Sequence, residues 1–351
     1  MTTNASSAIA AVLRPLDPAY APTPLLDLPR LAAHLGVAQV IAKNEGPRSL
    51  GSFKSLGGTY AGLRALARAA EMELPELLAE RPEGQLPLVC ASDGNHGLAV
   101  AAAARFAGAP ARVFLHGGVP PVRAQRIAAH GAQIIWVTGT YDDAVDAAAT
   151  EARKGGGILI ADTTDDPNDP VVHDVMAGYS VMAAEIREQA DAAGFARPTH
   201  VFVPAGVGGV AAAMAEGLAD WLAAPGLVVA VEPEGTACLV AALAAGRPVR
   251  VPGDLHTAAE MLSCGKASAP ALAVLRRHEA RVVTVSEPEL TAAPDILSAH
   301  GGPLTTPSGA ASLAGAIAAR QTTMQDLGLD ADSRLLILVT EGALASVKRV
   351  L

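Results

Sequence analysis

The stretch Leu50-Gly-Ser-Phe-Lys-Ser-Leu-Gly-Gly-Thr-Tyr60 places one lysine, Lys54, directly before a segment, 56–70, that reads as a helix. Its neighbours are apolar or small, and such surroundings depress the pKa of a lysine because burial disfavours the charged ammonium. A neutral amine can attack an aldehyde and form a Schiff base, a common catalytic use of a partly buried lysine. The alternative is that Lys54 only extends its charged end into water from the first helical turn.

Segments outside this stretch alternate between predicted strands and predicted helices. Apolar runs predict strands at 37–43, 88–91, 111–115, 134–137, 158–161, 200–203, 227–231, 281–285 and 335–339. Helices are expected between them, at 56–70, 97–107, 122–130, 141–154, 174–189, from about 209, and 308–320. Residues 1–24 read as an extended lead-in and residues 72–87 as a connector. This alternation, with strands that lack a period of two, predicts parallel sheets covered by helices on both faces.

Composition narrows the class of protein. The chain has 351 residues, of which half are hydrophobic and 17% are charged, which predicts a globular protein with room for two domains. Only 3% of the residues are aromatic and the net charge is −9, so a nucleic-acid partner is not expected. The apolar runs are too short to span a bilayer, so no membrane partner is expected either.

The cysteines and the N-terminal residues bear on the compartment. Cys90, Cys238 and Cys264 are far apart and odd in number, which predicts reduced thiols and no disulfide framework. Residues 1–10 lack the basic and apolar regions of a signal peptide. We therefore expect a cytoplasmic protein.

A glycine-rich loop, Gly206-Val-Gly-Gly-Val-Ala211, follows a predicted strand and opens a predicted helix. Free backbone N–H groups and the positive end of a helix favour an anion there, and glycine lets a phosphate approach the backbone. The spacing fits G-x-G-x-x-A, and Glu232 ends the next strand at the place of a ribose-binding acid, which predicts a nicotinamide dinucleotide. The single phosphate of pyridoxal phosphate is the other candidate, and a tight turn without a ligand is the third interpretation.

A second loop, Ser92-Asp-Gly-Asn-His-Gly97, follows another predicted strand. In the simplest interpretation Ser92 or Asp93 caps the alanine-rich helix that follows. Asn95 is a weak helix former, and an amide at a strand-to-helix turn can bind a cofactor hydroxyl. Asp93 can serve as a general base if it is held near a substrate carbon.

An acidic turn begins at Asp162, at the end of a predicted strand. For Asp165, Asp166 and Asp169 we expect a solvated turn; the alternative is a cation site, although the spacing is not that of an EF-hand. Asp162 differs because its strand-end position directs it toward the edge where parallel sheets collect ligands. The histidines form no metal-binding motif, so no metal is expected.

Lys54 in Ser-Phe-Lys-Ser-Leu-Gly-Gly, Asp93 in Asp-Gly-Asn-His-Gly and the loop 206–209 follow one another at suitable intervals. Together they resemble the pyridoxal-phosphate enzymes of fold type II, the tryptophan-synthase-β family, over roughly residues 40–342. Each motif alone is common, whereas the combination is specific.

Within that family the chain is most similar to the diaminopropionate ammonia-lyases. Most of the superfamily has a hydroxyl residue where Asp93 stands, whereas this subgroup has Asp-Gly-Asn-His-Gly. The pair Asp162-Thr163, the run Val175-Met-Ala-Gly-Tyr179 and the run Thr340-Glu-Gly342 match the same subgroup.

The resemblance implies a role for each matched residue. Lys54 would hold pyridoxal 5'-phosphate covalently, Asn95 would bind the ring hydroxyl, and Thr340 would meet the ring nitrogen. The phosphate would be cradled by Gly206, Val207, Gly208 and Gly209. Asp93 and Asp162 would lie on opposite sides of the substrate, and each would deprotonate one isomer, L or D, at Cα.

The implied reaction is an α,β-elimination of 2,3-diaminopropionate to pyruvate and ammonia. The implied fold is α/β, with two open, mostly parallel sheets flanked by helices and an active site between two domains. We expect a large cofactor-binding domain formed by 1–85 and 186–351 and a smaller mobile domain formed by 86–185, with boundaries good to about 10 residues. The family also implies a homodimer.

Two departures from the family pattern leave the substrate open. The chain is shorter than the family leads one to expect, and residues 165–170 are acidic where the family is more aromatic. Serine/threonine dehydratase-like and cysteine desulfhydrase-like eliminations are alternatives on the same fold. Alternatives of another class are an NAD(P)-dependent dehydrogenase built on Gly206–Ala211 and Glu232, and a non-catalytic amino-acid-binding protein.

Overall fold

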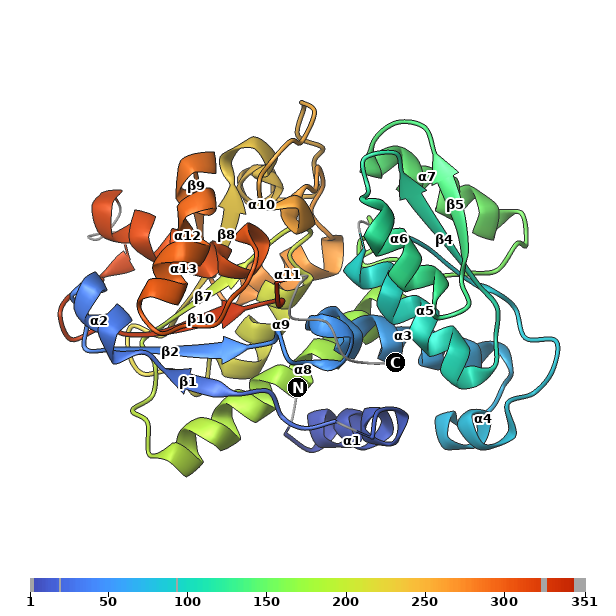
Figure 1. The fold of residues 1–351 in the computed structure, drawn as a ribbon, viewed down its shortest axis with the longest axis horizontal. Coiled ribbons are helices and arrows are strands. Elements are labelled where there is room, and N and C mark those ends of the chain that lie inside the picture. The colour runs from blue at the N-terminus through green and yellow to red at the C-terminus, as the bar shows by residue number, and fades with distance from the viewer. Residues whose placement is uncertain (1–2, 19, 93, 323–326, 344–351) are drawn as a thin grey trace.

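Two β-sheets, each covered by helices, form the framework of the chain (Figure 1). The structure is a computed structural model that describes residues 3–18, 20–92, 94–322 and 327–343. Nearly all strand pairs are parallel, so the predicted architecture of two open, mostly parallel sheets flanked by helices is confirmed.

The larger sheet has six strands. In spatial order they are β1 (Leu25–Asp27), β2 (Gln39–Asn44), β10 (Arg334–Val339), β7 (His200–Pro204), β8 (Leu227–Pro233) and β9 (Arg281–Val285). Only the β1–β2 pair at the edge is antiparallel. The central strand β10 is buried on both faces: Leu336 and Leu338 pack into one hydrophobic core, and Leu335 and Ile337 pack into the other. This burial explains why the strand sequences show no alternation.

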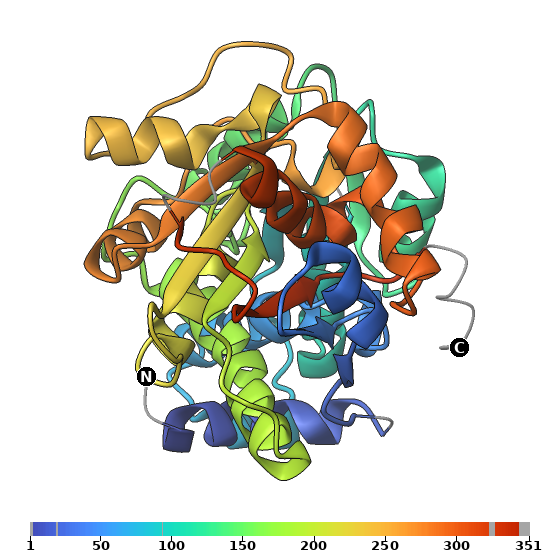
Figure 2. The ribbon, with the colours of Figure 1, turned by 90° about the vertical axis from the view of Figure 1, so that its left-hand side faces the viewer.

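Helices cover both faces of the larger sheet (Figure 2). On one face lie α2 (Pro29–Leu35), α12 (Glu287–Ala299) and α13 (Pro307–Thr322). On the other lie α8 (Pro170–Ala193), α9 (Gly209–Leu218), α10 (Cys238–Ala245) and α11 (Ala269–Arg277).

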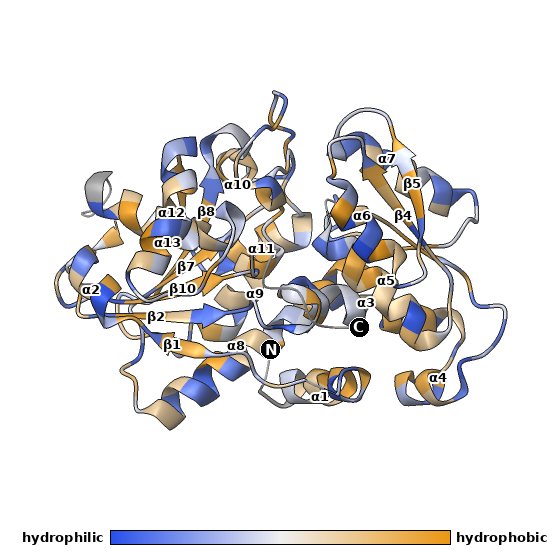
Figure 3. Cartoon of the chain, in the orientation of Figure 1, coloured by the Kyte–Doolittle hydropathy of each residue, from blue (hydrophilic) through white to orange (hydrophobic). Residues whose placement is uncertain are grey.

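The smaller sheet has four parallel strands. Their order is β5 (Gln133–Val137), β4 (Ala111–His116), β3 (Leu88–Ala91) and β6 (Ile158–Leu159). On one face lie α5 (Asn95–Ala107) and α6 (Pro121–Ala128), and on the other lies α7 (Tyr141–Arg153). The strands of both sheets are coloured largely as apolar in Figure 3, as expected for strands covered on both faces.

Helix α3 (Lys54–Ala69) joins the two halves of the molecule, because it packs against both α5 and α8. Its approach to α8 depends on glycine. A Cβ atom at Gly178 would lie only 2.6 Å from the Cα of Gly57, so the two backbones are in direct contact. This crossing fixes the start of α3, where Lys54 lies.

Two predictions for connecting segments are wrong. Residues 1–24 do not form an extended lead-in, because α1 (Thr3–Leu13) buries Ile9 and Leu13, one helical turn apart. The connector 72–87 contains α4 (Leu74–Glu80). Pro75 lies in the first turn of this helix, which proline fits because its missing N–H has no partner to lose there. Within the described ranges, no helix combines the length and apolarity needed to cross a membrane.

Candidate active site

Most of the residues predicted from sequence meet in one cavity at the carboxyl ends of the strands of both sheets. The cavity is lined by Lys54, Asn95, Asp162, Gly206, Val207, Gly208, Gly209 and Thr340. Asn95 and Asp162 follow strands of the smaller sheet, whereas the glycine loop and Thr340 follow strands of the larger one. Asp93 lies outside the residues that the structure describes, so its predicted role stays a prediction.

Lys54 and Asp162 form an ion pair, with 2.5 Å between Nζ and Oδ2. Burial raises the pKa of Asp162, but the adjacent ammonium outweighs it and lowers the pKa to about 2. Burial likewise lowers the pKa of Lys54, but attraction to Asp162 outweighs it and raises the pKa above the ordinary range. The expectation of a depressed lysine pKa is therefore wrong for this structure, because apolar neighbours in sequence did not reveal the carboxylate beside the amine.

The glycine loop lies between β7 and the first turn of α9. Gly208 has φ +95°, a left-handed conformation that favours glycine, and its added Cβ would meet Leu239 at 3.0 Å. Two neighbours hold the loop carbonyls: Cys238 Sγ donates to Gly206 O at 3.3 Å, and Ser268 N donates to Val207 O at 2.9 Å. Since the loop carbonyls are held in this way and the first turn of α9 has unpaired N–H groups, the loop can receive an anion.

In the loop 92–97, one polar residue stabilises the local backbone and another lines the cavity. Ser92 Oγ accepts hydrogen bonds from Gly94 N at 2.9 Å and Gly97 N at 2.8 Å, so Ser92 holds the start of α5. Asn95 is the first residue of α5, and its side chain reaches the cavity.

Thr340 follows β10 directly and is buried at the cavity wall. Its hydroxyl lies 3.4 Å from Ser308 O, which is too long for a strong O–H···O bond. The hydroxyl can therefore turn to donate to a neutral ring nitrogen.

Two buried residues near the cavity were not assigned a role from sequence. The Tyr179 hydroxyl has no hydrogen-bond partner of good geometry among the described residues. Burial raises the pKa of Tyr179 to about 12, although Lys54 acts in the opposite direction. Glu341 is the other and bonds to Asn95. An added Cβ at Gly57 would lie 2.4 Å from the Tyr179 ring. Gly57 was therefore the available sequence signal for Tyr179, because glycine inside a helix marks a close approach of another group.

Glu232 does not lie where a ribose-binding acid is needed. Its carboxylate is fully buried and accepts hydrogen bonds from Leu239 N at 2.7 Å and Val240 N at 3.1 Å, at the start of α10. Burial raises the pKa of Glu232 to about 7. Because both carboxylate oxygens of Glu232 already accept hydrogen bonds from the protein, they are not available to bind a ribose. The nicotinamide alternative therefore loses one of the two features on which it depends.

The acidic turn after Asp162 has local partners. Asp169 accepts hydrogen bonds from Val171 N and Val172 N and so caps α8, and Asp165 pairs with Lys266 at 2.5 Å. Over the described part of the chain, no group of three or more His, Cys, Asp or Glu side chains is arranged to hold a metal ion.

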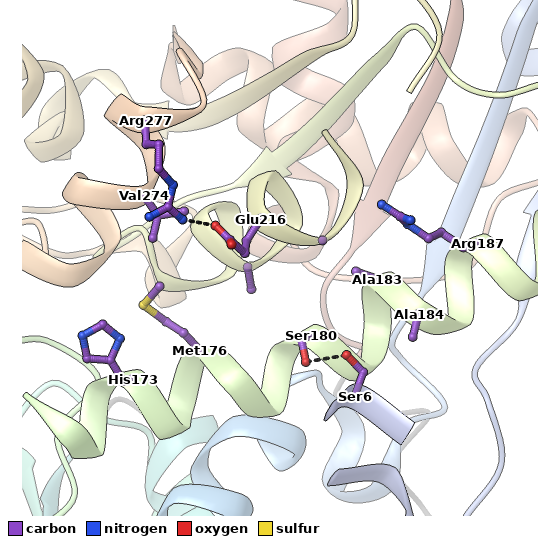
Figure 4. Close-up of a pocket in the computed structure, with 12 residues that line it drawn as sticks. Ser6, His173, Met176, Ser180, Ala183, Ala184, Arg187, Glu216, Val274 and Arg277 are labelled. Carbon is purple, nitrogen blue, oxygen red and sulfur yellow. Dashed lines mark hydrogen bonds and ion pairs between the residues drawn. The ribbon is translucent and has the colours of Figure 1, made fainter. Parts of the chain in front are cut away.

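A second cavity, of about 250 Å³, lies between α1, α8, α9 and α11 (Figure 4). It is larger than the predicted site, but four of its polar side chains are paired with one another. The Ser6 and Ser180 hydroxyl oxygens lie 2.9 Å apart, and Arg277 pairs with Glu216. No lysine and none of the predicted residues line it, so we assign the chemistry to the smaller cavity around Lys54.

The fold and this cavity define an enzyme that holds an anionic cofactor between two parallel sheets, close to a primary amine. The comparisons with known proteins agree. The family model for pyridoxal-phosphate dependent enzymes matches residues 16–341. The chain belongs to that family, and its cofactor is pyridoxal phosphate.

Two relatives, and a crystal structure of one of these enzymes, illustrate the similarity. Diaminopropionate ammonia-lyase of Escherichia coli K12 is 30% identical over 339 residues, which cover 92% of this chain and 85% of the relative. The enzyme of the same name from Salmonella typhimurium is 32% identical over 349 residues, covering 93% and 86% of the two chains. A crystal structure of the Escherichia coli enzyme in complex with an aminoacrylate-PLP azomethine reaction intermediate matches with a TM-score of 0.84 at 28% identity, covering 96% of this chain and 88% of that one.

The described residues fit this cofactor. The glycine loop at the start of α9 can take the phosphate, and Lys54 can take the aldehyde carbon. The buried Tyr179 hydroxyl, which has no partner of good geometry, and the weakly bonded Thr340 hydroxyl offer polar atoms that the protein leaves available.

Proposed function

We propose that the chain catalyses the α,β-elimination of D- and L-2,3-diaminopropionate to pyruvate and ammonia. The observation that carries the proposal is the buried carboxylate of Asp162, 2.5 Å from the amine of Lys54. Support also comes from the two relatives named diaminopropionate ammonia-lyase and from the relative whose structure contains an aminoacrylate intermediate.

The cofactor supplies an electron-withdrawing ring that stabilises the carbanion left when Cα loses its proton. The residues of this chain would anchor and orient it. Lys54 provides the point of attachment, the loop 206–209 binds the phosphate, Asn95 binds the ring hydroxyl, and Thr340 donates to the ring nitrogen. Because Thr340 is neutral, it leaves the ring nitrogen without a full positive charge.

Asp162 is the proposed base for one isomer of the substrate. Its pKa is about 2 while the Lys54 ammonium lies beside it, so it is a poor base in that arrangement. With Lys54 uncharged, the ammonium would no longer offset burial, and the pKa of Asp162 would rise. Asp162 is then a better acceptor for a proton from Cα. Asp93 is the proposed base for the other isomer.

A carboxylate at this position also suits a diamino acid. 2,3-Diaminopropionate carries one more ammonium group than serine or threonine, and Asp162 offers it a negative charge within a buried site. This argument favours the diamino acid over the serine, threonine and cysteine alternatives.

Pyruvate release from each isomer tests the proposal. We expect Asp162→Asn to abolish turnover of one isomer and spare much of the other, with Asp93→Asn doing the reverse. Asp165→Asn is the matched control, because Asp165 lies in the same acidic turn but pairs with Lys266. Equal losses for both isomers in both variants would contradict the division of roles. Faster turnover of L-serine, L-threonine or L-cysteine than of either diaminopropionate isomer would contradict the substrate.

We also propose that the chain forms a cytoplasmic homodimer in which residues 86–185 move as a smaller domain over the cofactor domain, 1–85 and 186–351. The four-stranded sheet lies within the smaller range. Its boundary near 185 falls inside the continuous helix α8, so we place the moving part at the sheet and its own helices. Light scattering tests the dimer: a monomeric mass at micromolar concentration would contradict it.

A further inference from the structure

Glu341 is a buried acid next to the cofactor site that the proposed chemistry does not use. It follows Thr340, and its backbone forms an antiparallel bridge with Ser52, two residues before Lys54. Phe53 N donates to Thr340 O at 3.2 Å, and Gly342 N donates to Gly51 O at 3.1 Å. The end of β10 is therefore tied to the backbone that carries Lys54.

The two carboxylate oxygens of Glu341 have different partners. Thr306 Oγ1 donates to Oε1 at 2.5 Å, and Asn95 Nδ2 donates to Oε2. Thr306 precedes α13 of the larger sheet, whereas Asn95 begins α5 of the smaller one. Glu341 thus links the two halves of the molecule next to Asn95, which lines the cavity.

The direction of the Asn95 amide follows from this contact. Asn95 Nδ2 donates to Glu341 Oε2, so the NH₂ end of the amide faces Glu341. An NH₂ group has two N–H bonds, and Glu341 uses one of them. Because Asn95 also lines the cavity, the second N–H is the donor that this side chain can offer there.

We propose that Glu341 is a positioning residue: it fixes the Asn95 amide so that an N–H group, and not the amide oxygen, is presented to the ring hydroxyl of the cofactor. The inference rests on the part of the proposed function that gives Asn95 this role. It does not depend on which amino acid is the substrate.

The test uses the enzyme loaded with pyridoxal phosphate, without any amino acid. In Glu341→Gln the side chain can donate as well as accept, so the direction of the Asn95 amide is no longer set. We expect a shifted pH midpoint of the visible absorption band and about tenfold weaker cofactor binding, in line with the loss of a charge-assisted hydrogen bond. Glu341→Asp keeps a carboxylate as the hydrogen-bond acceptor, so its pH midpoint and its cofactor affinity should lie closer to those of the unmodified enzyme.

Glu260→Gln is the matched control. Glu260 is also an acid between the two halves, where it pairs with Arg123 at 2.6 Å, but no contact joins it to Asn95. We expect the pH midpoint of its absorption band to equal that of the unmodified enzyme.

A double substitution separates positioning from a general structural effect. If Glu341 acts through Asn95, Glu341→Gln should cause no further spectral shift in an Asn95→Ala background. An equal shift in both backgrounds, or an unshifted band in Glu341→Gln, would overturn the inference. Because no amino acid is added, these outcomes are independent of the pyruvate assays that test the substrate.

Discussion

Lys54 Nζ lies 2.5 Å from the Asp162 carboxylate, and attraction to that carboxylate outweighs burial and raises the pKa of the amine. An ammonium cannot attack an aldehyde, and Asp162, with a pKa of about 2, is too weak a base to remove the proton. We therefore expect covalent attachment of the cofactor at Lys54, its proposed point of attachment, to be slow at neutral pH and faster as the pH rises.

Asp162→Asn should speed this attachment at neutral pH. Without the carboxylate, burial dominates and the pKa of Lys54 falls; each unit of that fall increases the neutral fraction about tenfold. The measurement is the growth rate of the visible band after pyridoxal phosphate is mixed with cofactor-free protein between pH 6 and 10. The rate should rise with pH in the unmodified protein and level off at lower pH in the variant.

A change in phosphate binding alone would alter the rate without moving the pH midpoint, and this outcome would contradict the explanation. Asp166→Asn serves as the control, since Asp166 lies in the same turn, is exposed, and accepts a hydrogen bond from Asn168 N within that turn. Its pH profile should match that of the unmodified protein.

At the scale of elements, the crossing of α3 and α8 positions the lysine. An added Cβ at Gly178 would lie 2.6 Å from both Leu56 O and Gly57 Cα, and these are backbone atoms with little freedom to move away. Overpacking of this kind costs about 1–3 kcal/mol, which exceeds the gain of up to about 1 kcal/mol from replacing glycine by alanine in a helix.

Gly178→Ala should therefore lower the free energy of unfolding by about 1–2 kcal/mol and weaken cofactor binding, because α3 begins at Lys54. Urea unfolding of the cofactor-free protein and equilibrium dialysis with pyridoxal phosphate measure the two effects. Gly117→Ala is the control, because a Cβ there meets nothing within 4 Å. A variant as stable as the control would show that the crossing adjusts without cost.

The sequence predicted those site residues that a local motif marks, and it missed the contacts between residues that are far apart in the chain. Strand-end motifs revealed Asn95, Thr340 and the glycine loop, because parallel strands bring their carboxyl ends together. The prediction of a lowered pKa for Lys54 was wrong because its carboxylate partner, Asp162, lies 108 residues away in the sequence. Glu341 was overlooked for the same reason, since 246 residues separate it from Asn95. The element α4 was missed because a proline that begins a helix resembles one that ends it.

For the whole molecule, the two halves are held together across the mouth of the site by ion pairs. Arg123 pairs with Glu260, Lys266 with Asp165, and Arg250 with Asp142. In each pair one partner is more than half exposed, so each pair contributes less than about 1 kcal/mol. The cavity around Lys54 has a volume of about 70 Å³, well below the roughly 300–1,000 Å³ of ligand pockets in general. This small volume agrees with the proposal that the two halves separate when the cofactor enters.

Breaking the Arg250–Asp142 pair should make that separation easier and speed cofactor uptake. Arg250→Ala and Asp142→Asn remove the same contact, but they change the local charge in opposite directions. Since pyridoxal phosphate is an anion, charge attraction alone predicts slower uptake in the first variant and faster uptake in the second. Easier opening predicts faster uptake in both, by up to about fivefold for a pair worth less than about 1 kcal/mol.

The growth rate of the visible band, measured at low salt and again at 0.5 M salt (about 4 Å Debye length), distinguishes these explanations. Both variants should lose most of their advantage at high salt, because screening weakens the same pair in the unmodified protein. Arg187→Ala is the control, since Arg187 pairs with Asp220 beside α8 and α9, within one half of the molecule. If Arg250→Ala slows uptake while Asp142→Asn speeds it, charge at the mouth governs entry, and the ion pair does not hold the two halves closed.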